Sequence, residues 1–421
     1  MAEVFRHRSD DLSLSQILTA VEKWRYASPP EDHALEELEA CWRSLSGKSD
    51  SVSRQLRVTT SLLLGNLHRE AGRRDDALAC YDRGLEGWQG PEEGGEVLAN
   101  EVANLRTNRA ICLMGGERWA EALDDLEDAI RLRESLPLDE QPVFRWGFAA
   151  GWINRGDVLS ALGRDEESIA SYDRALEELA LMESSAAVAQ RTAVAWNNRG
   201  LVLEKLDRRT EAGESFGNAS SGLEGATDEL ALLTRAAARL HQSRVSGTGD
   251  IEGAWEALRS SIDFERSNPT AAEISLKARH RICQCLCRDL GGRESGTGDW
   301  IGTTTDLVDE GLELSRAWEE AGVSALRPVA LDLFRLGLRV YRVCQPHFLA
   351  EFILESLDPE ASPGAPGGDP DFQAAAVETL SVALRESLER GVLEDRGEKE
   401  LAIGRALRAA DERLAAIQAA G

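Results

Sequence analysis

Long apolar runs and an excess of basic charge are both absent from this chain. No stretch of its 421 residues approaches the roughly 20 apolar residues that a membrane-spanning helix needs. Residues 1–18 lack a long apolar run behind a basic start, so no secretory signal is expected. The chain has 74 acidic and 48 basic residues, a formal net charge of −26. Nucleic acid binding requires a basic face, so it is not expected, and the acidic surface favours a basic protein partner.

Cysteines and strand patterns are also scarce. The seven cysteines are odd in number and irregularly spaced, which is not the pattern of a disulfide framework, and a cytoplasmic location is expected. Apolar residues recur at helical spacing instead of alternating, as around Leu63 and Leu67. The sequence therefore predicts an all-α protein of roughly eighteen helices. Prolines and glycines place helix breaks near residues 90, 137, 184, 225, 247 and 296.

Catalytic and metal-binding motifs are not convincing at any position. The G-x-S-x-G word at 213–217 lies in a helical pattern, whereas a nucleophile elbow needs a strand-to-helix turn. His280, Cys283 and Cys287 share one face of a helix, but Cys285 points away and no second ligand pair is evident. We therefore expect buried cysteines, no metal, no cofactor and no enzymatic activity.

The word SGTGD occurs twice, at 246–250 and at 295–299. Paired glycines before an acid suggest a phosphate-binding loop. A dinucleotide loop, however, has the spacing G-x-G-x-x-G after a strand, whereas both copies here have G-x-G-x-x-x-G between helical patterns. We expect helix-connecting turns at both places.

An internal repeat organises the first half of the chain. The words TNRA (107–110), INRG (153–156) and NNRG (197–200) recur at steps of 46 and 44 residues. Gly65, Ala110, Gly156 and Gly200 are each followed at offsets of 12, 16 and 19 by a small–large–small triplet. The triplets are Ala77/Tyr81/Gly84, Ala122/Leu126/Ala129, Ser168/Tyr172/Ala175 and Ala212/Phe216/Ala219. Self-similarity at a fixed period predicts a solenoid.

Over residues 55–225 this pattern resembles the tetratricopeptide repeat, in which a large and then a small residue precede such a triplet. The resemblance implies an α-solenoid of antiparallel helical hairpins. That family repeats about every 34 residues, so the longer period here must extend the helices or the turns. The expected organisation is an N-terminal hairpin at 1–54, repeats at 55–225, divergent helical repeats at 226–357, a Pro/Gly linker at 358–369 and a helical cap at 370–421.

The resemblance also implies binding residues, because the first helices of the hairpins line the groove of such proteins and their asparagines often bind a ligand's backbone. An amide both donates and accepts hydrogen bonds, so it can contact main chain of any sequence. The candidates are Asn66, Asn104, Asn108, Asn154, Asn197 and Asn198. Bonding within the solenoid or exposure to water is the alternative. The family's clamp for acidic C-terminal tails is not expected, because Leu62, Ala150 and Asn154 occupy its basic positions.

A repeated spacing predicts ion pairs within hairpins. Arg109 precedes Glu127, and Arg155 precedes Asp173, by 18 residues in both cases. Arg199 meets Gly217 at the same offset, so it should either point elsewhere or contact a neighbouring unit.

The function that these patterns favour is a non-catalytic interaction scaffold that binds a peptide segment or helix of another protein in its groove. The alternative is a regulatory subunit that docks on an effector enzyme, a protease or a kinase, through residues 226–357.

Overall fold

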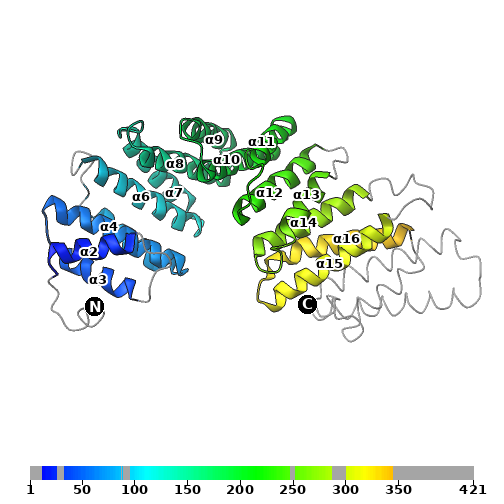
Figure 1. The fold of residues 1–421 in the computed structure, drawn as a ribbon, viewed down its shortest axis with the longest axis horizontal. Helices are drawn as coiled ribbons and strands as arrows, with labels where there is room; N and C mark the ends of the chain where they lie inside the picture. The colour runs from blue at the N-terminus through cyan, green and yellow to red at the C-terminus, as the bar shows by residue number, and fades with distance from the viewer. Residues whose placement is uncertain are drawn as a thin grey trace, which may run out of the picture. The chain divides into compact units, whose positions relative to one another are not determined.

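The structure is a computed structural model that describes residues 12–25, 33–86, 88, 95–246, 252–286 and 300–344. All secondary structure in these ranges is helical, which confirms the prediction of an all-α chain built from helical hairpins (Figure 1). The predicted linker at 358–369 and cap at 370–421 lie outside the described residues. No helix of the described part is long and apolar enough to cross a membrane.

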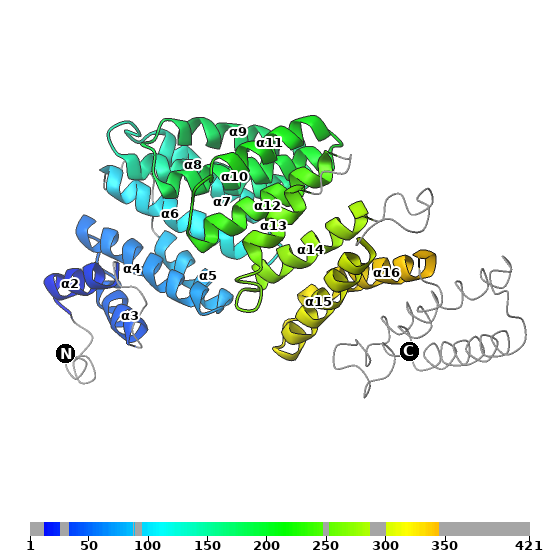
Figure 2. The ribbon, with the colours of Figure 1, turned by 45° about the vertical axis from the view of Figure 1, so that its right-hand side comes forward.

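The chain divides into two compact units, Met1–Arg208 and Arg209–Gly421. In the first unit, consecutive helices pair as hairpins, which can be followed from α4 to α9 in Figure 2. Its helices are α2 (Leu14–Arg25), α3 (Ala34–Leu45), α4 (Ser51–Glu70), α5 (Arg74–Leu85), α6 (Gly95–Met114), α7 (Trp119–Glu134), α8 (Pro142–Ala161), α9 (Asp165–Ala180) and α10 (Ala186–Lys205).

The long repeat period comes from the length of the helices. The helices α4, α6, α8 and α10 each have 20 residues, and α7 and α9 each have 16. A helix of 20 residues followed by one of 16 cannot fit within a period of about 34. Two of the long helices begin at a side-chain cap, since Asp50 accepts from the Ser53 amide and Ser185 from the Val188 amide.

The turn inside each hairpin has one recurring geometry. The residue seven positions after the small residue adopts a left-handed conformation, with φ of 73° at Gly72 and 74° at Gly163. Glu117 and Asp207 take the same conformation, with φ of 58° and 59°. In each case the next amide donates to the carbonyl five residues back, a helix-ending motif that satisfies the last carbonyls.

Close packing of the hairpins depends on the small residues. A Cβ on Gly156 would lie 2.6 Å from the Tyr172 ring, and one on Gly65 would overlap the Tyr81 ring. The second hairpin has Ala110 opposite Leu126, and both are fully buried. Alanine is larger than the glycine of the other two hairpins, and leucine is smaller than their tyrosine. Each core cluster takes residues from successive helices, as expected when each hairpin buries its apolar face against the next.

The second unit continues with α11 (Arg209–Ser221), α12 (Glu229–Val245), α13 (Glu252–Ser261), α14 (Pro269–Leu286), α15 (Trp300–Glu320), a 3-10 turn (Ser324–Leu326) and α16 (Arg327–Cys344). One apolar cluster joins α12 to α16, including the buried Leu240, Leu276 and Phe334. The G-x-S-x-G word lies inside α11, where Phe216 is fully buried.

The predicted helix breaks near 137, 184 and 225 fall between helices of the structure, and those near 90, 247 and 296 lie outside the described residues. The first SGTGD copy follows α12 and precedes α13, and the second lies between α14 and α15. Apart from Ser246, the residues of both copies lie outside the described residues, as does Cys287 of the cysteine cluster. Cys283, on α14, is fully buried.

Candidate functional site

One longitudinal row of side chains on the first helices of the hairpins collects most of the candidate residues. On α6 this row contains Asn100, Asn104 and Asn108, which are spaced by four residues and so share one face. We call the equivalent positions on the four helices the first-helix stripe. They are Gln55, Thr59 and Leu63 on α4, Trp146, Ala150 and Asn154 on α8, and Gln190, Val194 and Asn198 on α10. The helices α4, α6, α8 and α10 contact each other in sequence, so the rows lie side by side.

Asn66 and Asn108 connect the first two hairpins. The Asn108 amide nitrogen donates to Asn66 Oδ1 at 2.9 Å, and the Tyr81 hydroxyl donates to the same oxygen at 2.8 Å. Tyr81 is the aromatic residue that packs inside the earlier hairpin. Its hydroxyl group therefore orients the Asn66 amide that accepts the hydrogen bond from Asn108 of the next hairpin.

The same arrangement recurs two hairpins later with a carboxylate in place of the amide. Asn198 donates to Asp157 Oδ1 at 3.0 Å, and the Tyr172 hydroxyl donates to it at 2.6 Å. Burial raises the pKa of Asp157, and the hydrogen bonds from Tyr172 and Asn198 oppose that shift because they stabilise the charged form.

Asn154 is the exception in this series. The second hairpin has Ile111 and Leu126 where the first and third have a polar acceptor and a tyrosine, so Asn154 finds no equivalent bond. Among the described residues, Asn154 has no hydrogen-bond partner, and its side chain is half-buried. Ile111 is 36% exposed, which is high for a large apolar residue. The free amide of Asn154 and the exposed Ile111 therefore occupy the positions that bonded pairs occupy between the other hairpins.

Arg133 is a buried cation that reaches the stripe from the end of α7. It is 1% exposed and donates to Asn104 Oδ1 at 2.6 Å, to the Thr107 hydroxyl at 3.2 Å and to Asn100 Oδ1 at 3.4 Å. All three acceptors are neutral, and burial without a nearby carboxylate lowers the pKa of Arg133 to about 10. Its guanidinium lies against Gly147 of α8, where a Cβ would come within 2.7 Å of Nε.

Within the described part of the chain, Arg191 of α10 resembles Arg133 in having no acidic partner. Its guanidinium carbon lies 3.5 Å from the centroid of the Trp146 ring, and its Nη1 donates to the Trp146 carbonyl at 3.1 Å. Burial lowers its pKa to about 10, again without a carboxylate to offset the effect.

The predicted ion pairs at an offset of 18 are wrong in their partners, although both arginines are paired. Arg109 binds Asp125 at 2.6 Å, sixteen residues on, and also Asp82 of the preceding hairpin. Arg155 donates to the Ser171 hydroxyl at 2.7 Å and to Glu127 at 3.1 Å.

The partners differ from the prediction because the pairing depends on which face of the second helix an acidic residue occupies, not only on its position along that helix. Asp125 is buried beside Arg109, whereas Glu127, two positions and about 200° further round α7, faces the next hairpin. Arg199 binds Asp173 of the preceding hairpin at 2.7 Å, and this is the predicted contact with a neighbouring unit.

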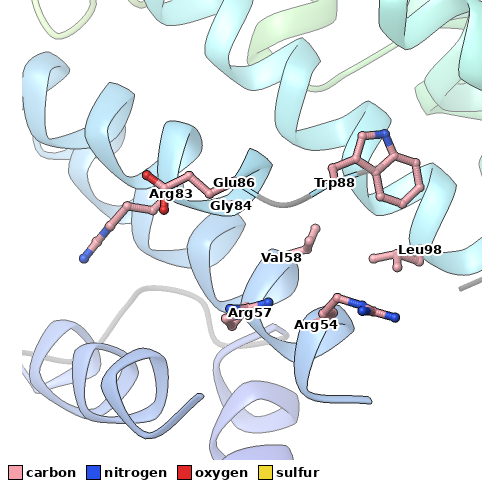
Figure 3. Close-up of a pocket in the computed structure, with 8 residues that line it drawn as sticks. All are labelled: Arg54, Arg57, Val58, Arg83, Gly84, Glu86, Trp88 and Leu98. Carbon is pink, nitrogen blue, oxygen red and sulfur yellow. The ribbon is translucent and has the colours of Figure 1, made fainter. Parts of the chain in front are cut away.

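A hollow between the first two hairpins has a basic lining (Figure 3). Arg54 and Arg57 of α4 lie near Trp88 and Leu98, and Arg83 lies on the opposite side with its guanidinium directed away from Trp88. Arg83 binds Glu39 at 2.9 Å, which neutralises its charge.

Four of the six predicted asparagines, Asn104, Asn108, Asn154 and Asn198, lie on the first-helix stripe, and all of these except Asn154 have an internal partner, as does Asn66. Asn197, on α10, is half-buried and also has a partner. Sequence reasoning missed Asp157, Arg133 and Arg191. Only Asp157 had a signal, because it directly follows Gly156 as Asn66 follows Gly65.

The comparisons with known proteins agree with the hairpin geometry. The tetratricopeptide repeat family matches residues 149–178, which cover most of α8 and α9. No curated protein matches the sequence.

The solved structures that are similar to this chain include two with the following statistics. One is BtubC (BKLC) from P. vanneervenii, at 17% identity over 68% of this chain and 96% of that chain, with a TM-score of 0.40. The other is a Rap protein complexed with competence and sporulation factor, at 12% identity over 96% of this chain and all of the other (100%), with a TM-score of 0.43.

The matched hairpin shares its small–aromatic contact, its left-handed turn and its hydrogen bonds between hairpins with the hairpin of α4 and α5. The chain therefore contains a tetratricopeptide-repeat match at residues 149–178, within a fold of helical hairpins.

Proposed function

We propose that this protein is a non-catalytic interaction scaffold that binds an extended segment of a partner protein along the first-helix stripe. The observation that carries the proposal concerns Asn154 and Ile111, which occupy the positions of the bonded pairs Asn108–Asn66 and Asn198–Asp157. Where the preceding hairpin provides a polar acceptor, the asparagine of the next hairpin is bonded to it. Where it provides Ile111 instead, the asparagine is left free among the described residues and an apolar side chain stays exposed.

A free amide beside an apolar side chain suits an extended peptide. The amide can donate to one backbone carbonyl and accept from one backbone N–H, while Ile111 contacts a side chain of the ligand. Asn108 and Asn198 each use only the amide nitrogen in the bonds described, so their Oδ1 atoms are still available as acceptors. Asn66 and Asn104 use Oδ1, which leaves their amide nitrogens available.

The net charge of −26 supports a partner that is basic over much of its surface. The same charge disfavours a nucleic acid partner. A cytoplasmic location and the absence of enzymatic activity belong to this proposal as well.

The test is a selection of short peptides from a random displayed library on the full chain, followed by calorimetric titration of the enriched peptides. Asn154→Ala should weaken binding by about 2- to 10-fold, the value of one or two hydrogen bonds to a neutral partner. The matched control is Asn218→Ala, an exposed asparagine inside α11 of the second unit, which should leave affinity unchanged.

Equal affinity of the Asn154→Ala variant for every enriched peptide would contradict the proposal. If the peptides instead depend on residues of 226–344, the function becomes that of a regulatory subunit that docks on an effector enzyme through the divergent helices.

A further inference from the structure

Most buried arginines among the described residues form an ion pair with a carboxylate, and one does not. Three arginines of the described residues are buried, Arg133 (1% exposed), Arg145 (7%) and Arg279 (1%). Arg145 binds Glu178, and Arg279 binds Glu265 at 2.8 Å. Arg133 has only the amide and hydroxyl oxygens of α6. The half-buried Arg191 likewise has only a backbone carbonyl and the Trp146 ring.

Both of these arginines lie at the same turn of α8. Arg133 packs against Gly147, and Arg191 stacks on Trp146, the residue immediately before it. Trp146 belongs to the first-helix stripe, and so does Asn104, which accepts from Arg133. Two positive charges, one from α7 and one from α10, therefore lie against adjacent residues of α8.

The two guanidiniums have donors left over. Arg133 has five N–H groups and makes three hydrogen bonds. Nε and Nη2 of Arg191 donate to no other side chain or carbonyl among the described residues. A buried cation without a counter-charge is costly, and a ligand anion would remove part of that cost when it binds.

We propose that Arg191, supported by the charge of Arg133, forms a subsite that binds the carboxylate of an Asp or Glu side chain in the bound segment. The proposal rests on the function above and adds the chemistry of one ligand residue to it. Arg191 has the accessible donors and would make the charge-assisted hydrogen bond, while Arg133 acts through its field from beneath Asn104.

The position of the acidic residue in the ligand follows from the helix geometry. Trp146 and Asn154 are eight residues apart on α8, which is about 12 Å at 1.5 Å per residue. An extended chain spans that distance with about four residues. The ligand should therefore have its acidic residue about four positions from the residue whose backbone contacts Asn154, even where the rest of the segment is basic.

The experiment compares peptide selections on the wild type, Arg191→Gln and Arg118→Gln. Arg118 is the control because it is an exposed arginine that pairs with Glu121 within its own turn. Peptides are displayed as fusions without a free C-terminus, so a terminal carboxylate cannot imitate the side chain. The wild type and Arg118→Gln should enrich Asp or Glu at one position, and Arg191→Gln should lose this preference.

Titration then measures the charge directly. Replacing the enriched Glu by Gln in the peptide should weaken binding to the wild type by about tenfold or more, and to Arg191→Gln by less than about twofold. Arg191→Lys should keep part of the difference and replaces Arg191→Gln if that variant does not fold. Enrichment without an acidic position, or an equal preference in Arg191→Gln, would overturn this inference alone. Failure to enrich any peptide would overturn the proposed function together with it.

Discussion

Asn198 and Asp157, which lie 41 residues apart, meet at 3.0 Å and hold the fourth first helix against the third. The equivalent bond between Asn108 and Asn66 uses an amide acceptor, so a charge is not required at this position. Since burial raises the pKa of Asp157, the folded state disfavours its charged form. We expect Asp157→Asn to be at least as stable as the wild type at neutral pH.

The pH dependence tests this interpretation. A carboxyl group whose pKa is raised in the folded state binds a proton more readily there than in the unfolded state. The unfolding free energy that it costs is therefore largest above the folded-state pKa and disappears as the pH falls. The advantage of Asp157→Asn should therefore shrink toward the ordinary carboxyl pKa of about 4. Asn66→Asp is the reciprocal control and should be destabilising. Urea unfolding followed by circular dichroism measures both; a less stable Asp157→Asn variant at all pH values would contradict the prediction.

The small–aromatic contact should show strong coupling. Gly156→Ala places a methyl group against the Tyr172 ring and should cost about 1–3 kcal/mol of unfolding free energy. The second hairpin solves the same packing problem with Ala110 and Leu126. The double variant Gly156→Ala/Tyr172→Leu should therefore lose about 1 kcal/mol less than the sum of the two single losses, measured in a double-mutant cycle. Additive losses would show that the two positions pack independently.

The fold was largely predictable because its determinants are local and repeated. The offsets of 12, 16 and 19 from Gly65, Ala110 and Gly156 place the packing residues, and the structure has Tyr81, Leu126 and Tyr172 buried at those positions. Helix breaks follow from the same periodicity. A contact between a small residue and an aromatic one depends on little beyond spacing, so sequence determines it well.

The polar contacts were less predictable because they depend on the direction in which long side chains extend. Arg109 and Arg155 could be identified as paired, but the choice of Asp125 and Glu127 as partners depends on the faces of α7. The bonding of Asn108 to Asn66 depends on a third residue, Tyr81, 15 positions from Asn66. Arg133 gave no signal, because its position is occupied by an apolar Leu179 in the next hairpin.

Two arginines with equal burial should respond differently to removal of their charge. Arg133→Met removes a cation that has only neutral partners, and we expect the unfolding free energy to stay within about 1.5 kcal/mol of the wild type. Arg279→Met leaves the buried Glu265 without its cation and should cost about 3–5 kcal/mol. Thermal and denaturant unfolding of both variants would test this, and equal losses would mean that the acid partner does not matter.

His241 of α12 should make the second unit sensitive to mild acid. Burial, reinforced by the charges of Arg244 and Lys277, lowers its pKa to about 3. Its ring packs 5.1 Å from the Phe216 ring, centroid to centroid. Between pH 6.5 and pH 3 the unfolded chain therefore binds a proton that the folded chain does not, so stability falls as the pH falls. Relative to His241→Gln, the wild type should lose about 2 kcal/mol between pH 8 and pH 5, at about 1.4 kcal/mol per pH unit below 6.5. Comparing the two chains cancels the titration of the many carboxylates that they share. An equal loss in both chains would show that His241 is protonated in the folded state and that its burial does not exclude the charge.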